Sequence, residues 1–161
     1  MLRFMKILLV LGVALWCLLG ALGNLTDWSG TTSAVKTVIS MATFEDGAAH
    51  WRATSNPVVI TMGALFIMLY KTVAGLLCLE GARRMWGARA NGAADFAKAK
   101  TFALTGCAVA VFMLFVGFSA IAETWFELWR SEAMREPVLA SAFRYAGMVS
   151  LIAIFVGMHD E

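Results

Sequence analysis

One lysine in this chain lies where a charge is costly. Lys71 is inside a long apolar segment, and Glu80 follows it nine residues later in the same segment. Nine residues turn an α-helix by about 900°, which places the two side chains on opposite faces. Such a cation serves a substrate or proton site, or it is a packing or subunit-interface charge whose amine reaches towards the membrane surface. We favour the packing interpretation, because no other apolar segment carries an acidic residue deep within it.

Two further sets of charged residues lie near the ends of apolar segments. Glu80 is followed by Arg83 and Arg84 at helical spacing, so we expect a structural ion pair there. Glu123 lies at the end of the third apolar segment (residues 101–122), and Arg144 lies at a comparable depth in the fourth (residues 138–158). Their opposite charges suggest a pair that ties these two segments together.

The histidines and cysteines do not form a recognisable metal or haem site. His50 and His159 fall in segments that we expect on opposite faces of the membrane, so a single chain cannot offer both to one iron. Cys17, Cys78 and Cys107 have no CxxC spacing, and we expect them to pack as small apolar side chains. The sequence therefore predicts no metal site, no cofactor and no catalytic residue.

These residues must be positioned by membrane helices. Of 161 residues, 60% are apolar and 15% are charged, against ~45–50% and ~25% in soluble domains. A helix needs ~20 apolar residues to cross ~30 Å of hydrocarbon. The four segments that qualify are residues 7–23, 58–79, 101–122 and 138–158. We predict an all-α fold, a four-helix membrane bundle in which residues 1–161 form one domain.

The connections carry local signals of their own. In the outer segment 24–57, residues 31–43 have apolar side chains at helical spacing. This pattern predicts a short amphipathic helix at the membrane surface, with an irregular loop as the alternative. Asn56 before Pro57 predicts the start of the second span. Residues 1–23 are expected to remain as a span, although a cleaved signal peptide is the alternative.

The distribution of lysine and arginine predicts the orientation. One side of the four spans would carry seven of these residues and the other side four. The seven are Arg3, Lys6, Arg83, Arg84, Arg89, Lys98 and Lys100, and the four are Lys36, Arg52, Arg130 and Arg135. The excess places both termini and the loop 80–100 in the cytoplasm.

Aromatic residues gather in the two connections on the opposite side. Trp51 is followed by Arg52, and the third span is followed by Trp125, Phe126 and Trp129. Clustered tryptophans beside arginine are typical of a protein–protein hot spot. The same residues also suit an aromatic belt at the level of the lipid headgroups.

Small residues in the last two spans suggest how the helices pack. Small residues recur at heptad spacing in both spans. They are Ala103, Gly106, Ala110, Gly117 and Ala120 in the third span and Ala140, Gly147, Ser150 and Gly157 in the fourth. Small side chains let membrane helices approach closely. We therefore expect a packing seam on each of these spans.

Four short motifs resemble those of a known family. They are TFED at residues 43–46, WRAT at 51–54, GARRMW at 81–86 and WFELWRS at 125–131. They resemble a bacterial family of predicted small integral membrane proteins, domain of unknown function 2165. The resemblance implies a four-helix protein of the inner membrane and supplies no activity. Thr124 and Lys71 depart from the family pattern, because acidic residues are expected at both positions.

Two functions remain open at this point. The first is an accessory or scaffold subunit of a larger inner-membrane complex, without a catalytic site. The second is a small oligomeric transporter or channel that uses Lys71. The expected partners are the lipid bilayer and other membrane-protein subunits or further copies of the chain, but not nucleic acid.

Overall fold

Every regular element in the computed structural model, which describes residues 1–160, is a helix. In chain order the elements are α1 (Leu2–Thr26), α2 (Trp28–Ile39), η1 (Gly47–Ala49), α3 (Pro57–Gly87), α4 (Ala93–Ala99), α5 (Thr101–Met113), η2 (Leu114–Trp125), η3 (Leu128–Arg130), α6 (Glu132–Met134), η4 (Arg135–Ala140) and α7 (Ser141–Gly157).

Four helical rods are long and apolar enough to cross a membrane. They are Leu2–Thr26, Pro57–Gly87, Ala93–Trp125 and Glu132–Gly157, with 25, 31, 33 and 26 residues. At about 1.5 Å per residue, each exceeds the ~30 Å of hydrocarbon. The prediction of an all-α fold with four membrane-length helices is confirmed. Asn56 begins α3 as its side chain accepts a hydrogen bond from Val58 N at 2.8 Å.

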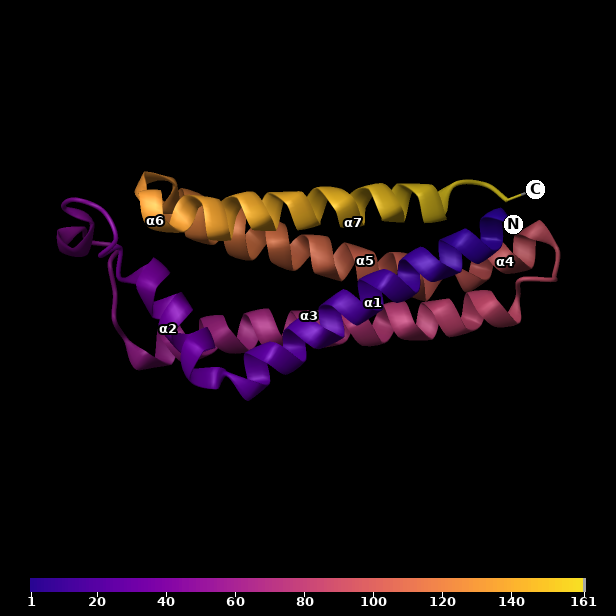
Figure 1. Cartoon of the computed structure of the whole chain (residues 1–161), viewed down its shortest axis with the longest axis horizontal. Coiled ribbons are helices and arrows are strands. Elements are labelled where there is room, and N and C mark those ends of the chain that lie inside the picture. Colours follow the sequence, from indigo (N-terminus) through magenta and orange to yellow (C-terminus); the bar gives the residue numbers. More distant parts are fainter. Residues whose placement is uncertain (161) are drawn as a thin grey trace.

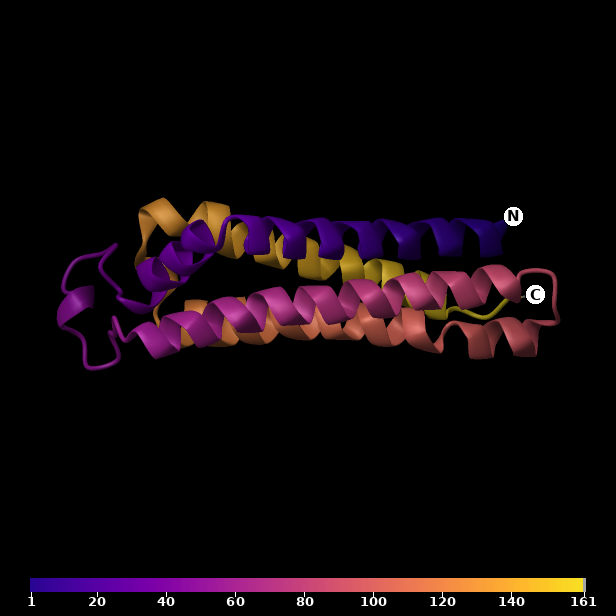
Figure 2. The same cartoon turned by 90° about the horizontal axis from the view of Figure 1, so that it is seen from below.

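The rods pack side by side, and the chain reverses direction between them (Figures 1 and 2). The N-terminus, the tail after α7 and the turn between α3 and α4 lie at one end of the bundle. We call this the terminal end. The α2–α3 connection and the loop around η3 lie at the opposite end, which we call the cap end.

Small residues of α5 pack closely against α3. Ala103, Gly106 and Ala110 are all buried. A Cβ built on Gly106 would lie 2.6 Å from Cys78 Sγ, so no larger residue fits there without moving a helix. The fourth span differs, because a Cβ on Gly147 would meet nothing within 4 Å. The expected seam is therefore present on the third span and absent at Gly147.

Helix α1 ends before it reaches the cap end. Gly20 of α1 faces Lys71, and Gly63, further along α3 towards the cap end, faces Val35 of α2. The chain turns at Asp27, whose carboxylate accepts a hydrogen bond from Gly30 N at 2.9 Å and so begins α2. This helix overlaps the predicted amphipathic segment, but its position at the membrane surface stays a prediction.

Two stretches near the cap end are π-helical. They are η2 and η4, which continue directly into α5 and α7 at opposite sides of the η3 loop. Thr124 Oγ1 donates to Ser119 O at 2.8 Å, five residues back, as the wider π-helical turn allows. Such stretches are rare in proteins, and those that do occur are often found at functional sites. Apolar periodicity alone did not reveal them.

Candidate functional site

The cap consists of the loop 40–56 and the loop 126–131, which meet beyond the ends of the long helices. Three of its non-glycine residues adopt left-handed backbone conformations: Met41 (φ 53°), Asp46 (φ 59°) and Glu127 (φ 51°). Thr54 N donates to Ile39 O at 2.9 Å and closes the first loop back onto α2. Residues hold such conformations only where their surroundings determine them, so the cap has a defined shape.

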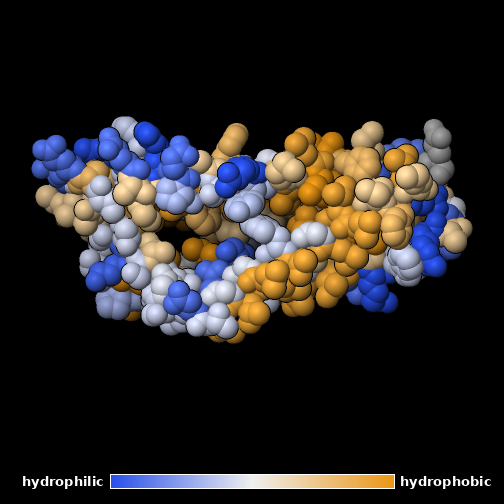
Figure 3. All heavy atoms as spheres, in the orientation of Figure 1, coloured by the Kyte–Doolittle hydropathy of each residue, from blue (hydrophilic) through white to orange (hydrophobic). Residues whose placement is uncertain are grey.

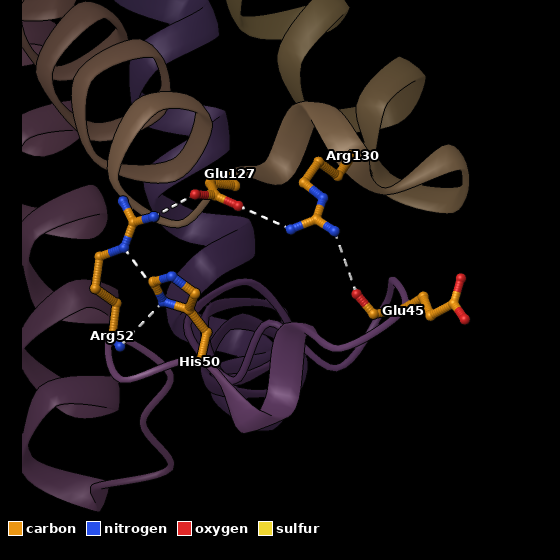
Figure 4. A network of polar contacts seen from close by, with 5 residues as sticks. All are labelled: Glu45, His50, Arg52, Glu127 and Arg130. Atoms are coloured by element: carbon orange, nitrogen blue, oxygen red, sulfur yellow. Dashed lines mark hydrogen bonds and ion pairs between the residues drawn. The ribbon is translucent and has the colours of Figure 1, made fainter.

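Glu127 joins the two loops (Figure 4). Its carboxylate forms an ion pair with Arg52 of the first loop and a second one, at 3.0 Å, with Arg130 of its own loop. Arg130 also donates to the backbone carbonyl of Glu45 at 3.4 Å. His50 Nδ1 accepts from Arg52 Nε at 3.4 Å. One carboxylate therefore bridges two arginines, and it lies 75 residues from Arg52 in the sequence.

Tryptophan rings enclose the Arg52 guanidinium. Its Cζ lies 5.8 Å from the Trp51 ring and 5.4 Å from the Trp125 ring. The two rings meet edge to face, with centroids 5.6 Å apart. Cation–π contacts of this kind hold the arginine in place while its charge pairs with Glu127. The structure thus brings together Trp51, Arg52 and Trp125, three of the residues singled out from the sequence.

The cap keeps Glu127 ionised. A hydrogen bond from Arg130 favours the charged carboxylate, partial burial opposes it, and a second hydrogen bond from Arg52 adds to the first effect. The result is a Glu127 pKa below its usual range. A carboxylate of this kind is a poor proton carrier near neutral pH, so the arrangement is suited to holding the loops together.

The aromatic residues of the cap divide into buried and exposed groups. Phe126 is 7% exposed and packs with Ile39 and Met41 beneath the loops. Trp51 is 78% exposed and Trp129 is 55% exposed. The exposed rings extend the apolar surface beyond the long helices, where a partner or the lipid headgroups would meet them.

A second polar cluster lies at the terminal end and was missed in the sequence. Asp160, in the tail after α7, forms an ion pair with Lys6 of α1 at 2.9 Å and another with Lys100 at the start of α5. Both ammonium groups also donate to Met158 O at 2.8 Å. The three charged side chains are no more than 4% exposed. We call these residues the terminal clamp.

The clamp also determines the charge of its carboxylate. Burial alone would raise the pKa of Asp160, but hydrogen bonds from Lys100 and Lys6 outweigh this effect. The Asp160 pKa therefore lies below its ordinary value. Sequence spacing carries no signal for this cluster, since Lys6 and Asp160 are 154 residues apart.

Lys71 is partly buried halfway along α3. Its Nζ donates to Asn24 Oδ1 at 3.0 Å, and Asn24 Nδ2 donates to Thr31 Oγ1 at 3.2 Å. Within residues 1–160 no carboxylate pairs with the ammonium group. A charge at the bilayer centre costs at least about 2.5–3.5 kcal/mol, so the surroundings of Lys71 must be polar.

The other charged candidates behave differently from one another. Glu80 pairs with Arg83 and Arg84, both at 2.7 Å, on the surface of α3. Glu123 and Arg144 do not pair in the described part of the chain. Arg144 donates to Ser141 Oγ on its own helix at 3.2 Å, which directs its side chain towards the cap end. The proposed link between the third and fourth spans is therefore not formed.

No arrangement of typical metal ligands is present among residues 1–160. His50 belongs to the cap, whereas His159 belongs to the tail at the terminal end. Cys17, Cys78 and Cys107 are buried free thiols. The described side chains thus offer three ion clusters, around Glu127, Asp160 and Glu80, and a cationic position at Lys71.

Comparisons with known proteins agree with this architecture. Searches of curated proteins and of solved structures found no match. A family model described as a predicted small integral membrane protein matches residues 2–159, nearly the whole chain. Its match includes the cap motifs and the membrane-length helices. The chain therefore belongs to the DUF2165 family of predicted small integral membrane proteins.

Proposed function

We propose that this membrane protein is a non-catalytic accessory subunit that binds a partner protein through its cap. The proposal rests on one observation: the loops 40–56 and 126–131 are joined, and exposed tryptophans lie on both. Arg52, Glu127 and Arg130 hold the loops in one arrangement, and Trp51 and Trp129 project from it. Pre-organised tryptophans beside arginine bind with little loss of conformational freedom.

The chemistry of the cap favours a protein partner over a substrate. Its carboxylate is occupied by two arginines, and its histidine nitrogen accepts from Arg52. The carboxylate and His50 Nδ1 are thus engaged in holding the loops together. A partner with an apolar patch would cover Trp51 and Trp129, which the chain leaves exposed.

The proposal is tested by isolating a native complex and then measuring whether a cap variant loses it. The protein is solubilised from its own membranes in mild detergent, and the mass and subunit ratio of the complex are measured. Trp129→Ala removes an exposed cap ring, and Trp86→Ala, 46% exposed at the terminal end, is the matched control. A hot-spot tryptophan contributes at least ~2 kcal/mol, so affinity should fall about thirtyfold in the cap variant alone.

Two results contradict the proposal. One is a chain that runs as a monomer or as copies of itself, without a stoichiometric partner. The other is a complex that Trp129→Ala leaves as intact as Trp86→Ala does. Thermal unfolding of both variants in detergent shows that they are folded, so that lost binding is not confused with lost structure.

We further propose that the protein lies in the inner membrane with its terminal end in the cytoplasm. The start of α1, the end of α3 and the residue before α5 carry Arg3, Lys6, Arg83, Arg84 and Lys100, which fits the excess of positive charge on cytoplasmic sides. Reporter fusions at the N-terminus and within the loop 40–56 should report opposite sides of the membrane.

Transport is the second candidate, and Lys71 is the observation that favours it. A cation halfway along a membrane helix, with an amide as its hydrogen-bond acceptor, suits a pathway for an anion. Flux of a small anion into vesicles that contain the purified protein tests this role. Flux that collapses in Lys71→Met would support transport and argue against a purely accessory role.

A further inference from the structure

The turn between α1 and α2 lies deeper in the bundle than its polarity suits. Helices α1 and α3 are antiparallel, and Gly20 is level with Lys71. Following this register, Thr26 at the end of α1 is about level with Leu65, and α3 starts eight residues further out at Pro57. Eight residues correspond to ~12 Å along a helix. The polar turn therefore lies within the apolar length of α3.

This turn exposes polar groups at that depth. Residues 24–33 read NLTDWSGTTS, and Thr26, Asp27, Ser29 and Ser33 are exposed. Hydrocarbon offers no hydrogen bonds to such groups, so they must face water or a polar ligand. The α1–α2 turn thus indicates a wet region inside the leaflet nearer the cap.

The structure is hollowed beside this turn. Helix α2 packs against α1 and α3, whereas α7 packs against α5 and η2. Figure 3 shows an opening between α2 on one side and α7 on the other, close to the cap end. Ile39, Met41 and Phe126 pack together beneath the cap loops. Contact between Trp16 and Tyr145, with centroids 5.0 Å apart, joins α1 to α7 further along the bundle.

Lys71 and Asn24 bring a positive charge to the same region. The ammonium group has three N–H donors, and one of them is used by Asn24 Oδ1. The Lys71 side chain packs against Gly20 of α1, where a Cβ would lie 3.4 Å from Lys71 Nζ. Asp27, the acidic residue nearest to Asn24 in the chain, already accepts from Gly30 N and Ser29 Oγ. In the described part of the chain Lys71 Nζ donates to Asn24 Oδ1, which leaves its other two donors for an anion.

We propose that Lys71 and Asn24 form a binding site for an oxyanion, reached sideways from the leaflet nearer the cap. The opening lies beside the apolar length of α3, at the depth of the lipid, so a lipid-borne phosphate or carboxylate oxygen is the occupant that the geometry favours. This site does not rest on the docking function proposed above, because its residues belong to α1 and α3 and lie below the cap.

Binding is tested with vesicles of phosphatidylcholine that contain a minority of phosphatidylglycerol. The protein is extracted from them, and the phosphatidylglycerol that remains bound is counted by native mass spectrometry. Lys71→Met should reduce it about tenfold or more, since a charge-assisted hydrogen bond is lost. Lys71→Arg should retain it. Lys36→Met, which removes an exposed lysine from α2, is the matched control and should also retain it.

A second variant keeps the lysine and blocks the site. Asn24→Asp has almost the same shape and supplies an internal carboxylate 3 Å or so from the ammonium group, at the position where Asn24 Oδ1 lies at 3.0 Å. This variant should remain folded in a thermal unfolding assay and should lose bound phosphatidylglycerol as Lys71→Met does. It keeps the proposal falsifiable if Lys71→Met does not fold.

The source of the oxyanion is decided by competition. Inorganic phosphate that displaces phosphatidylglycerol from the wild-type protein would identify a free anion as the ligand, whereas failure to displace it would identify the lipid. Either result supports the site. The proposal is overturned if wild type binds neither probe, if Lys71→Met and Asn24→Asp bind as wild type does, or if Lys36→Met loses as much as Lys71→Met.

Discussion

Replacing Asp160 by asparagine tests the terminal clamp most directly. The change leaves the ammonium groups of Lys6 and Lys100 buried without their carboxylate. Removing one partner of a buried ion pair costs about 3–5 kcal/mol. We expect the lower value, ~3 kcal/mol, because the clamp lies at the end of the bundle, where water is close.

The assay is thermal unfolding in detergent. For a chain of this length each kcal/mol shifts Tm by ~2–4 °C, so Asp160→Asn should lower Tm by about 6–12 °C. The control is Asp95→Asn, an exposed carboxylate in α4 at the same end. Removing the same charge from Asp95 should change Tm by no more than about 1–2 °C, as surface substitutions do.

The pH dependence gives the clamp a signature of its own. Because the pKa of Asp160 is lower in the folded protein than in the unfolded chain, the stabilisation is present above the ordinary aspartate pKa of about 4. It is lost as the pH falls through the folded value. Wild type should lose Tm faster than Asp160→Asn below pH ~4. Equal shifts for Asp160→Asn and Asp95→Asn would refute the reasoning.

Two further predictions concern packing and water access. Gly106→Ala should lower Tm by several degrees, because the new methyl group would lie 2.6 Å from Cys78 Sγ, whereas Gly147→Ala, in open space, should not; equal effects would show that α3 and α5 do not approach closely there. Ser33→Cys should react with a membrane-impermeant thiol reagent, since Ser33 is exposed on the polar α2 surface. Leu151→Cys, on the apolar surface of α7, should not react, and protection of Ser33→Cys would contradict a wet region at this depth.

Much of the architecture could be predicted from local sequence. Four apolar runs indicated four helices, and Asn56 before Pro57 marked the start of α3. These features depend on residues close together in the chain, where helix geometry relates spacing to structure. The cap was recognised in part for the same reason, since Trp51 and Arg52 are adjacent and Trp125 begins a compact motif.

The contacts between distant segments could not be predicted. Whether Lys6 meets Asp160 depends on the lengths of all four rods and on how they slide past one another, which apolar periodicity leaves undetermined. Glu123 and Arg144 illustrate the same difficulty. Similar depth suggested a pair, but Arg144 hydrogen-bonds to Ser141 on its own helix. Helix α1 ends about level with Leu65 of α3, and the polar turn follows there. The long apolar run of α1 did not predict this end point.

The terminal clamp has a consequence for how the protein is made. Asp160 is synthesised 154 residues after Lys6. At ~5–20 residues per second, the lysine waits roughly 8 to 30 s for its carboxylate. During synthesis the helical rods that are made first therefore lack the ion pairs of the terminal clamp. A chain that stops between Lys100 and Asp160 would keep both lysines without the carboxylate that neutralises them.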